Sequence, residues 1–297
     1  MRGLALAFAL LVLPANAQDH PPLRPATEDE QKARAAVVIA GYRYDDLLWE
    51  NDRIAYRIYG RALEKAEPPS SSGIDAWGKR VRWPFMDRQL RTGDQHRDHG
   101  EGLDFYNVGT GRGTGGLGIW YDNKLWTSRN YARHRIFDAG PRIADFSVDY
   151  DPWPVDVLRT VWETRRFTLP AGTNFTRLTS TIWSNPSGTL IVGIGLSKRP
   201  IAGSGLGEIE KDGTHARMTW WGPADPERGR MGAAIIVDPL AFAGFAEDAD
   251  NILILVRVEP GRPFIYYSGA AWDRSGDFAD RAAWQAYVDK QQPDFRP

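Results

Sequence analysis

The residues best suited to chemistry lie close together in the segment 95–118, QHRDHGEGLDFYNVGTGRGTGGLG. It holds two of the five histidines of the 297-residue chain, together with three carboxylates, a tyrosine and a glycine-rich loop. Groups of this kind move protons and grip polar ligands, and burying each of them unpaired would cost roughly several kcal/mol. We therefore expect this segment to line a wet concavity that serves as the functional site.

Proton transfer is the first chemistry that this segment suggests. Histidine can take up and return a proton near neutral pH, and a carboxylate beside it can hold the ring in one tautomer. Two histidines and two carboxylates, each pair separated by two residues, leave open which histidine acts as the base. The candidate catalytic residues are His96, His99, Tyr106, Asp98 and Glu101.

Metal binding is an alternative use of the same histidines. Imidazole and carboxylate ligands suit zinc or manganese, so His96 and His99 could hold a divalent metal together with a carboxylate. The pair lacks the one-turn helical spacing of the familiar zinc motif. We predict no required cofactor, with a divalent metal at His96 and His99 as the alternative.

The glycine-rich loop, residues 109–118, differs from a nucleotide-binding loop. It carries no lysine followed by serine or threonine, and the next residues, IWYDNKLW, predict a strand and a turn rather than a helix. Glycines here favour a close approach of two backbones, or a flexible loop at the rim of a cleft.

A second set of residues could bind a sugar. In the extended segment 73–84, GIDAWGKRVRWP, Trp77 and Lys79 would share one face. Aromatic rings stack on the apolar faces of sugars, and arginine pairs with carboxylates in a bidentate geometry. Twelve tryptophans fit a carbohydrate cleft, although they also fit the core of a β-sandwich. The candidate substrate-binding residues are Trp77, Lys79, Arg80, Trp83, Arg97, Trp120, Asn130 and Tyr131.

The elements that must position these residues are mostly strands. Segments such as AAVVIAGYRY, FTRLTSTIWS and NILILVRVE are short, rich in β-branched and aromatic residues, and bounded by turn residues. Helical signals are confined to a polar segment near the start, where Thr27 and Glu30 have capping-box spacing, and to the tail around Trp284 and Val288. We predict an all-β protein, a large antiparallel β-sandwich with little helix.

The amino terminus predicts export. One basic residue precedes a short apolar run, and the small-x-small pattern before Gln18 is typical of a signal-peptidase site, so residues 1–17 are predicted to be a signal peptide. Residues 18–40 are then a linker or N-terminal segment, and residues 41–297 form the β-domain. We expect a periplasmic or secreted protein, not held in a membrane after cleavage.

Composition narrows the partners. The chain has 37 basic and 38 acidic residues, and this balance gives no electrostatic case for nucleic acid. The absence of cysteine excludes disulfides and a cysteine nucleophile. A polar small molecule is the expected partner, and the sequence makes no prediction of oligomeric state.

Several segments in succession resemble a known family: YDDLLWENDRIAYRIYG, SGIDAWGKR, HRDHGEGLDFYNVGTGRGTGG, DNKLWTSRNY and ETRRFTLPAGTNFTRLTST. The chain resembles, over about residues 41–290, an uncharacterised family of exported bacterial domains of unknown function, often encoded beside enzymes that degrade acidic polysaccharides. That family resembles the galactose-mutarotase-like supersandwich, which implies a two-sheet sandwich with a sugar-binding concave face. Gln95 stands where relatives tend to carry an aromatic residue.

The function predicted from these observations is action on uronate-containing oligosaccharides by β-elimination, of the lyase or dehydratase type. His96 or His99 would remove the proton next to the carboxylate, and Tyr106 would protonate the leaving oxygen. Arg80 or Lys79 would pair with the carboxylate. The alternatives are a non-catalytic carbohydrate-binding protein and a sugar mutarotase or epimerase.

Overall fold

Three antiparallel sheets make up the fold. The computed structural model describes residues 20–201 and 203–297, so the predicted signal peptide lies outside the described residues. Within each sheet every pair of neighbouring strands is antiparallel. In the described ranges no helix is long and apolar enough to cross a membrane. The predicted all-β antiparallel sandwich is confirmed.

The strands of each sheet are given below in their spatial order, so that consecutive names are hydrogen-bonded neighbours. The first sheet contains β1 (Ala35–Ala40), β2 (Asp46–Asn51), β3 (Ala55–Ile58), β4 (Asp75–Lys79) and β5 (Gly102–Leu103). The large sheet contains β13 (Glu208–Asp212), β14 (Arg217–Trp221), β15 (Met231–Val237), β18 (Pro263–Trp272), β11 (Phe175–Asn185), β10 (Thr160–Pro170), β9 (Ile143–Pro154) and β8 (Arg133–Asp138). The third sheet contains β16 (Phe242–Glu247), β17 (Asn251–Val258), β12 (Leu190–Ser197), β6 (Thr114–Tyr121) and β7 (Lys124–Trp126).

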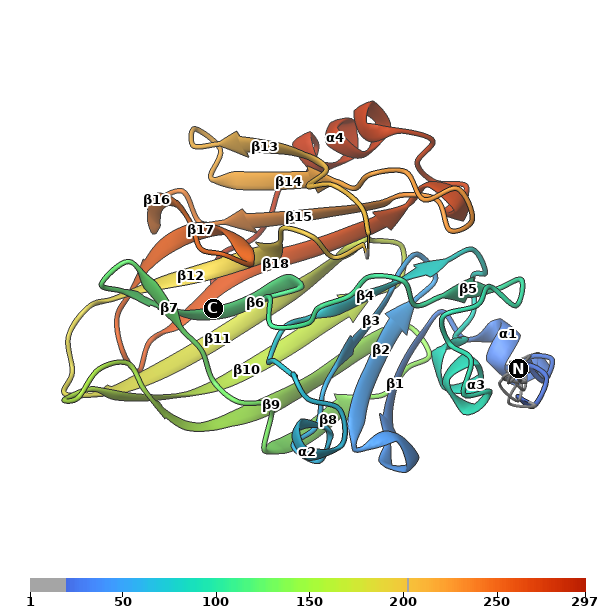
Figure 1. Ribbon diagram of the computed structural model, residues 1–297, viewed down its shortest axis with the longest axis horizontal. Helices are drawn as coiled ribbons and strands as arrows, with labels where there is room; N and C mark the ends of the chain where they lie inside the picture. The colour runs from blue at the N-terminus through green and yellow to red at the C-terminus, as the bar shows by residue number, and fades with distance from the viewer. Residues whose placement is uncertain (1–19, 202) are drawn as a thin grey trace, which may run out of the picture.

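The sandwich has the large sheet as one layer and the two smaller sheets, side by side, as the other (Figure 1). Alternate residues of the long strands point into one apolar core, as the burial of β10 and β11 shows. Trp49 of β2 links the layers, because its ring lies 5.3 Å from the ring of Phe146 and 5.1 Å from that of Phe167. The smaller sheets are therefore fixed on a broad, rigid base.

Short helices cover the outer faces. The structure contains α1 (Glu28–Lys32), α2 (Leu63–Ala66), α3 (Met86–Arg91) and α4 (Arg281–Asp289), with 3-10 turns η1 (Gly41–Arg43) and η2 (Asp273–Ser275). The predicted tail helix is confirmed, since Trp284 and Val288 of α4 are buried against the large sheet. The sequence did not predict α2 and α3, which are only four and six residues long and have no side-chain cap.

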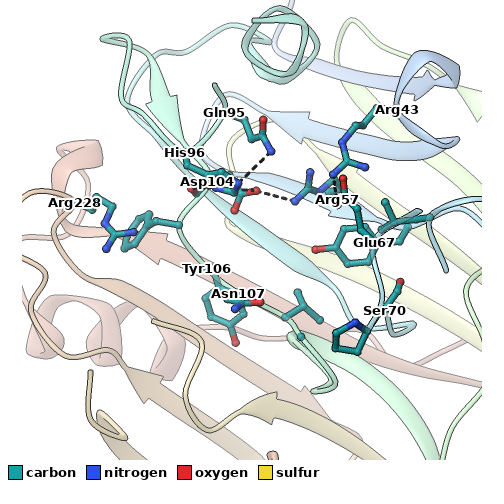
Figure 2. A pocket seen from close by; sticks show the side chains of 16 residues that line it. Arg43, Arg57, Glu67, Ser70, Gln95, His96, Asp104, Tyr106, Asn107 and Arg228 are labelled. Atoms are coloured by element: carbon teal, nitrogen blue, oxygen red, sulfur yellow. Dashed lines mark hydrogen bonds and ion pairs between the residues drawn. The ribbon is translucent and has the colours of Figure 1, made fainter. Parts of the chain in front are cut away.

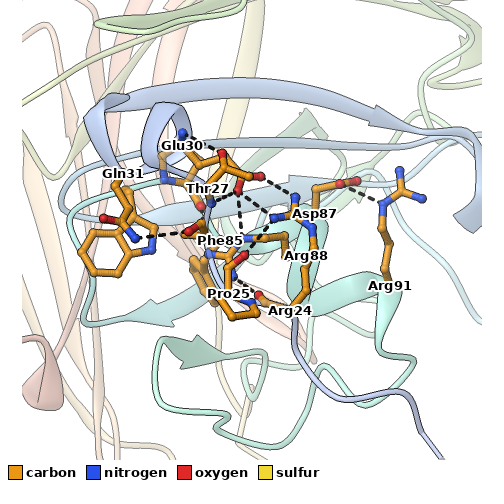
Figure 3. A network of polar contacts seen from close by, with 12 residues as sticks. Arg24, Pro25, Thr27, Glu30, Gln31, Phe85, Asp87, Arg88 and Arg91 are labelled. Carbon is orange, nitrogen blue, oxygen red and sulfur yellow. Dashed lines mark hydrogen bonds and ion pairs between the residues drawn. The ribbon is translucent and has the colours of Figure 1, made fainter.

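The N-terminal segment is tied to the first sheet. Thr27 and Glu30 form the predicted capping box, with the Glu30 amide donating to the Thr27 hydroxyl over 3.2 Å. Arg24 pairs with Glu30, and Arg88 of α3 donates to the Arg24 carbonyl over 2.9 Å (Figure 3). β1 then enters the first sheet directly, so the sandwich includes residues that precede residue 41.

The glycine-rich loop joins the two smaller sheets. Gly113, in the left-handed region at φ 63°, forms a bridge with Ile74, and a Cβ at Gly113 would stand 1.9 Å from the Ile74 carbonyl oxygen. Gly111 and Gly115 also lie against other segments. Of the two interpretations of this loop, the structure supports the close approach of backbones.

We expect Gly113→Ala to destabilise the protein by about 3 kcal/mol or more, since it adds a steric clash to left-handed backbone strain. Gly276→Ala is the matched control, because Gly276 has φ 84° but nothing within 4 Å of an added Cβ. That control should lose only about 1–2 kcal/mol. Urea denaturation of the two variants measures the difference, and equal losses would contradict the role assigned to the close approach.

Candidate functional site

A polar cavity of about 470 Å³ lies beside the first sheet (Figure 2). Its lining comes from η1, the end of β3, the turn around α2, the segment 95–109 and the loop that carries Arg228. The lining residues are Arg43, Arg57, Tyr59, Leu63, Glu67, Pro69, Ser70, Gln95, His96, Asp104, Phe105, Tyr106, Asn107, Val108, Gly109 and Arg228. No strand of the large sheet contributes a lining residue, so this cavity differs from the concave sheet face implied by the family resemblance.

Arg57 forms the charged floor of the cavity. It sits on β3 between Tyr56 and Ile58, which point into the core, so its side chain lies on the opposite face of the sheet. One guanidinium nitrogen of Arg57 lies 2.7 Å from Asp75 Oδ2 and 2.7 Å from Asp104 Oδ2. The pairing ties β3 to β4 and to the segment that carries the candidate histidines.

The carboxylates around Arg57 outnumber it. Asp75 is fully buried, and burial together with the charge of Asp104 raises the pKa of its carboxyl, outweighing the attraction of Arg57. Asp46 lies 3.7 Å from Arg57, and neither of its carboxylate oxygens has a hydrogen-bond partner in the described part of the chain. Burial raises the pKa of Asp46 to about 6. The floor therefore holds carboxyl groups that keep their protons more readily than exposed ones.

His96 is held at the edge of the cavity with a defined tautomer. Its Nδ1 lies 2.9 Å from the backbone carbonyl oxygen of Asp104, which can only accept a hydrogen bond, so Nδ1 carries the proton. Nε2 is then the basic nitrogen, and the side-chain amide of Gln95 donates to it over 3.2 Å. The His96 side chain is 66% exposed, which leaves the ring open to a ligand.

The other predicted catalytic residues lie in different surroundings. Among the five, His96 and Tyr106 line the cavity. The Tyr106 hydroxyl donates to the Gly113 carbonyl over 2.9 Å, and burial raises its pKa. His99 contacts the Asp94 carbonyl at 3.2 Å. Asp98 pairs with Arg80, and Glu101 pairs with Arg88.

The hydroxyl of Tyr106 is thus already engaged away from the cavity, and His99, Asp98 and Glu101 lie outside the lining. His96 and His99 bond to carbonyls of two different residues. Within residues 20–201 and 203–297, no group of three or more His, Cys, Asp or Glu side chains is arranged to hold a metal ion.

The predicted substrate-binding residues lie outside the cavity lining as well. Trp77 and Lys79 are buried under α3, where Lys79 pairs with Glu50 and donates to the Trp83 carbonyl over 2.6 Å, so neither presents a free surface to a sugar. Arg80 lies 4.9 Å from the Trp272 ring in addition to its pairing with Asp98. The Trp83 indole donates to Glu101 over 3.3 Å.

Of the remaining four residues of that set, Trp120 lies in β6 of the third sheet and the other three lie outside the named strands. Asn130 is buried and donates to the Gly60 carbonyl and the Ser70 hydroxyl, at 3.1 and 2.7 Å, and Tyr131 donates to the Asp45 carbonyl. Arg97 is exposed, and Trp120 is half-buried in β6. Their contacts show structural pairings at Asn130 and Tyr131 rather than a common binding surface.

The sequence patterns did not predict Arg57, which forms the charged floor of the cavity, or most of the other lining residues. They did not point to Arg43, Arg57, Tyr59, Glu67, Asn107 and Arg228, although all of them line it. One signal was present for Arg57 and Asp75, because each is a charged residue inside an otherwise apolar strand pattern, RIAYRIYG and GIDAWG. Arg228 offered no comparable signal, since it comes from a distant loop.

The fold and this site together define an all-β sandwich protein with a polar cavity beside an oriented histidine. The chain belongs to the family described as Domain of unknown function (DUF4861), which matches residues 15–296. Uncharacterized protein P7 of Formosa agariphila is 28% identical over 263 residues, which cover 83% of this chain and 64% of that protein. This chain therefore spans less than two thirds of that relative.

Among solved structures, the galactosidase domain of alpha-galactosidase-sucrose kinase AgaSK is similar with a TM-score of 0.39 and 9% identity. The match covers 80% of this chain and 41% of that one. A likeness this distant shows nothing about function.

The raised pKa of Asp46 predicts a pH-dependent stability. The stabilising effect of its bound proton is fully present below about pH 4 and is lost as the pH rises through about 6. Between pH 4 and 7, wild type should therefore lose up to about 3 kcal/mol of unfolding free energy relative to Asp46→Asn, at about 1.36 kcal/mol per pKa unit. Urea denaturation at several pH values measures this, with Asp122→Asn in an exposed turn as control. A pH-independent difference for Asp46→Asn would refute the burial argument.

Proposed function

We propose that this chain is an exported protein that binds uronate-containing oligosaccharides in the cavity and acts on them by β-elimination. A volume of about 470 Å³ is in the range of small-molecule sites. Gln95, Asn107 and Ser70 offer hydrogen-bonding groups for sugar hydroxyls, and the ring of Tyr59 offers an apolar face for stacking. The site thereby combines the two kinds of contact that a sugar requires.

Two arginines are the candidates for binding the uronate carboxylate. Arg43 pairs with Glu67 through Nη2 over 2.6 Å, and its Nη1 lies 4.0 Å from Asp46 Oδ2. Arg228 lies in another part of the lining and pairs with Asp225. A carboxylate at either guanidinium would form a charge-assisted hydrogen bond and neutralise negative charge that develops during elimination.

The observation that carries the proposal is the orientation of His96. Its basic Nε2 lies at a polar cavity and accepts a hydrogen bond from the Gln95 amide, which a substrate must displace, while Nδ1 is fixed by the Asp104 carbonyl, whose residue is in turn held by Arg57. This is the arrangement that a general base requires. Export, for its part, is supported by the signal-peptide pattern of residues 1–17.

Tyr59 replaces Tyr106 as the proposed acid. Its hydroxyl has no hydrogen-bond partner in the described ranges, and burial and the charge of Asp75 raise its pKa, so it stays protonated. In the proposed step, His96 Nε2 takes the proton from the carbon next to the carboxylate. The electron pair of that C–H bond forms a C=C bond and expels the β-oxygen, which receives the Tyr59 proton.

One alternative reaction has a specific observation in its favour. Mutarotation or epimerisation uses a histidine acid with a glutamate base, and Glu67 lines the same cavity as His96. It would leave the mass of the sugar unchanged and create no double bond. A non-catalytic binding protein would use the cavity without any need for an oriented base.

We expect wild type to produce unsaturated uronates from an oligouronide panel, seen as new ultraviolet absorbance and by mass spectrometry, with and without chelator. His96→Gln should lower the rate by about 10²–10⁴-fold, because that is the typical contribution of a general base. Tyr59→Phe should lower it similarly. His215→Gln, on an exposed turn, removes a histidine without touching the cavity and should keep full activity.

Calorimetry on the same variants separates the alternatives. If wild type binds oligouronides but forms no product, the chain is a non-catalytic binding protein. If it exchanges anomers without new ultraviolet absorbance, it is a mutarotase. Failure of every oligouronide to bind would reject the proposal as a whole.

A further inference from the structure

A second polar cluster lies inside the sandwich, away from the cavity. Arg165 and Glu163 of β10 are 0% and 1% exposed, and Arg112, from the loop before β6, is 1% exposed. Tyr150 of β9 is 2% exposed, and the Arg165 guanidinium lies 4.9 Å from the centre of its ring. These four side chains bring three ionic groups into a region that is otherwise apolar core.

The charges of this cluster do not balance. The Glu163 carboxylate is already hydrogen-bonded within β10 and to β11. It accepts two hydrogen bonds from Arg165 and one from Ser180, each at 2.7 Å. Arg112 forms no ion pair with any residue that the structure describes, and it donates to the Ser72 hydroxyl over 3.0 Å. The cluster therefore holds two guanidinium groups and a single carboxylate, which pairs with Arg165 alone.

Arg112 stays charged in this position. Burial and the nearby charge of Arg165 lower the pKa of its guanidinium to about 10, which still leaves it protonated at neutral pH. Asp248 and Asp250 attract it more weakly than Arg165 repels it. A buried charge without a partner is strongly unfavourable, so one positive charge needs compensation.

The cluster also contains unsatisfied hydrogen-bond donors. Arg112 Nε, Arg165 Nη1 and the Tyr150 hydroxyl are all buried without a hydrogen-bond partner in the described part of the chain. The fold makes room for Arg112 with a glycine, because a Cβ at Gly195 of β12 would stand 2.7 Å from Arg112 Cβ. The position is thus built to hold the arginine inside the sandwich.

We propose that Arg112, Arg165 and Tyr150 bind a small inorganic monovalent anion such as chloride between the two layers. The anion accepts hydrogen bonds from the spare donors and cancels the excess charge. This site is separate from the sugar cavity, does not depend on the proposed reaction, and serves the stability of the sandwich. Water could satisfy the donors but would leave the charge uncompensated.

Thermal unfolding in a chloride-free gluconate buffer, titrated with chloride at constant ionic strength, tests the proposal. A ligand that binds only the folded state should raise the Tm of wild type with the logarithm of its concentration above Kd, by about 2–5 °C for each tenfold increase. Arg112→Met should abolish the rise. Arg262→Met, which removes the same charge from an exposed position, should keep it.

A second measurement keeps the proposal testable if Arg112→Met fails to fold. Anomalous diffraction from wild-type crystals soaked in bromide should show a peak within hydrogen-bonding distance of Arg112 and Arg165. A Tm that does not respond to chloride, or responds equally in Arg112→Met, would overturn the proposal, as would a bromide map without a peak at this place.

Discussion

The candidate site depends on the buried guanidinium of Arg57. Its contacts with Asp75 and Asp104, both at 2.7 Å, join two strands of the first sheet to the segment that carries His96. Asp104 in turn positions the His96 ring through its backbone carbonyl. Losing one partner of a buried ion pair typically costs about 3–5 kcal/mol, because the other charge is left uncompensated. The orientation of the histidine is therefore coupled to the packing of the first sheet.

The sheets differ in what they contribute to the core and to the cavity. The large sheet supplies the largest share of the apolar core of any sheet and no lining residue of the cavity, whereas the first sheet and its loops carry the charged groups. Rings such as Trp49 pack between the two layers. A rigid base of this kind lets the functional groups lie on short strands and loops, where polar side chains are easier to satisfy.

The sequence predicted the architecture because strand patterns are local. Alternation along β10 and β11, and the helical spacing of Trp284 and Val288, each follow from one segment read alone. The site is not local. His96 was found from its neighbours, but Arg228 comes from a loop far along the chain, and Trp77 was expected at a surface although α3 covers it. When a short helix or a distant loop buries a residue such as Trp77, the residues around it in the sequence do not indicate that burial.

The choice between Tyr106 and Tyr59 shows the same limit of local patterns. Tyr106 stands in the chemically rich segment, yet its hydroxyl bonds to Gly113, a contact created by the close approach of the glycine loop. Tyr59 lies in a strand pattern that resembles ordinary core, and its place in the cavity depends on the pairing of β3 with β4. Only the tertiary structure distinguishes these two hydroxyl groups.

The central claim is that the cavity floored by Arg57 is where the ligand binds. A crystal structure of the inactive His96→Gln variant with a uronate oligosaccharide tests it most directly. We predict a sugar ring against Tyr59, with its carboxylate at Arg43 or Arg228. A sugar bound instead at the exposed surface near Trp120 or Arg97, with the cavity free of it, would contradict the account.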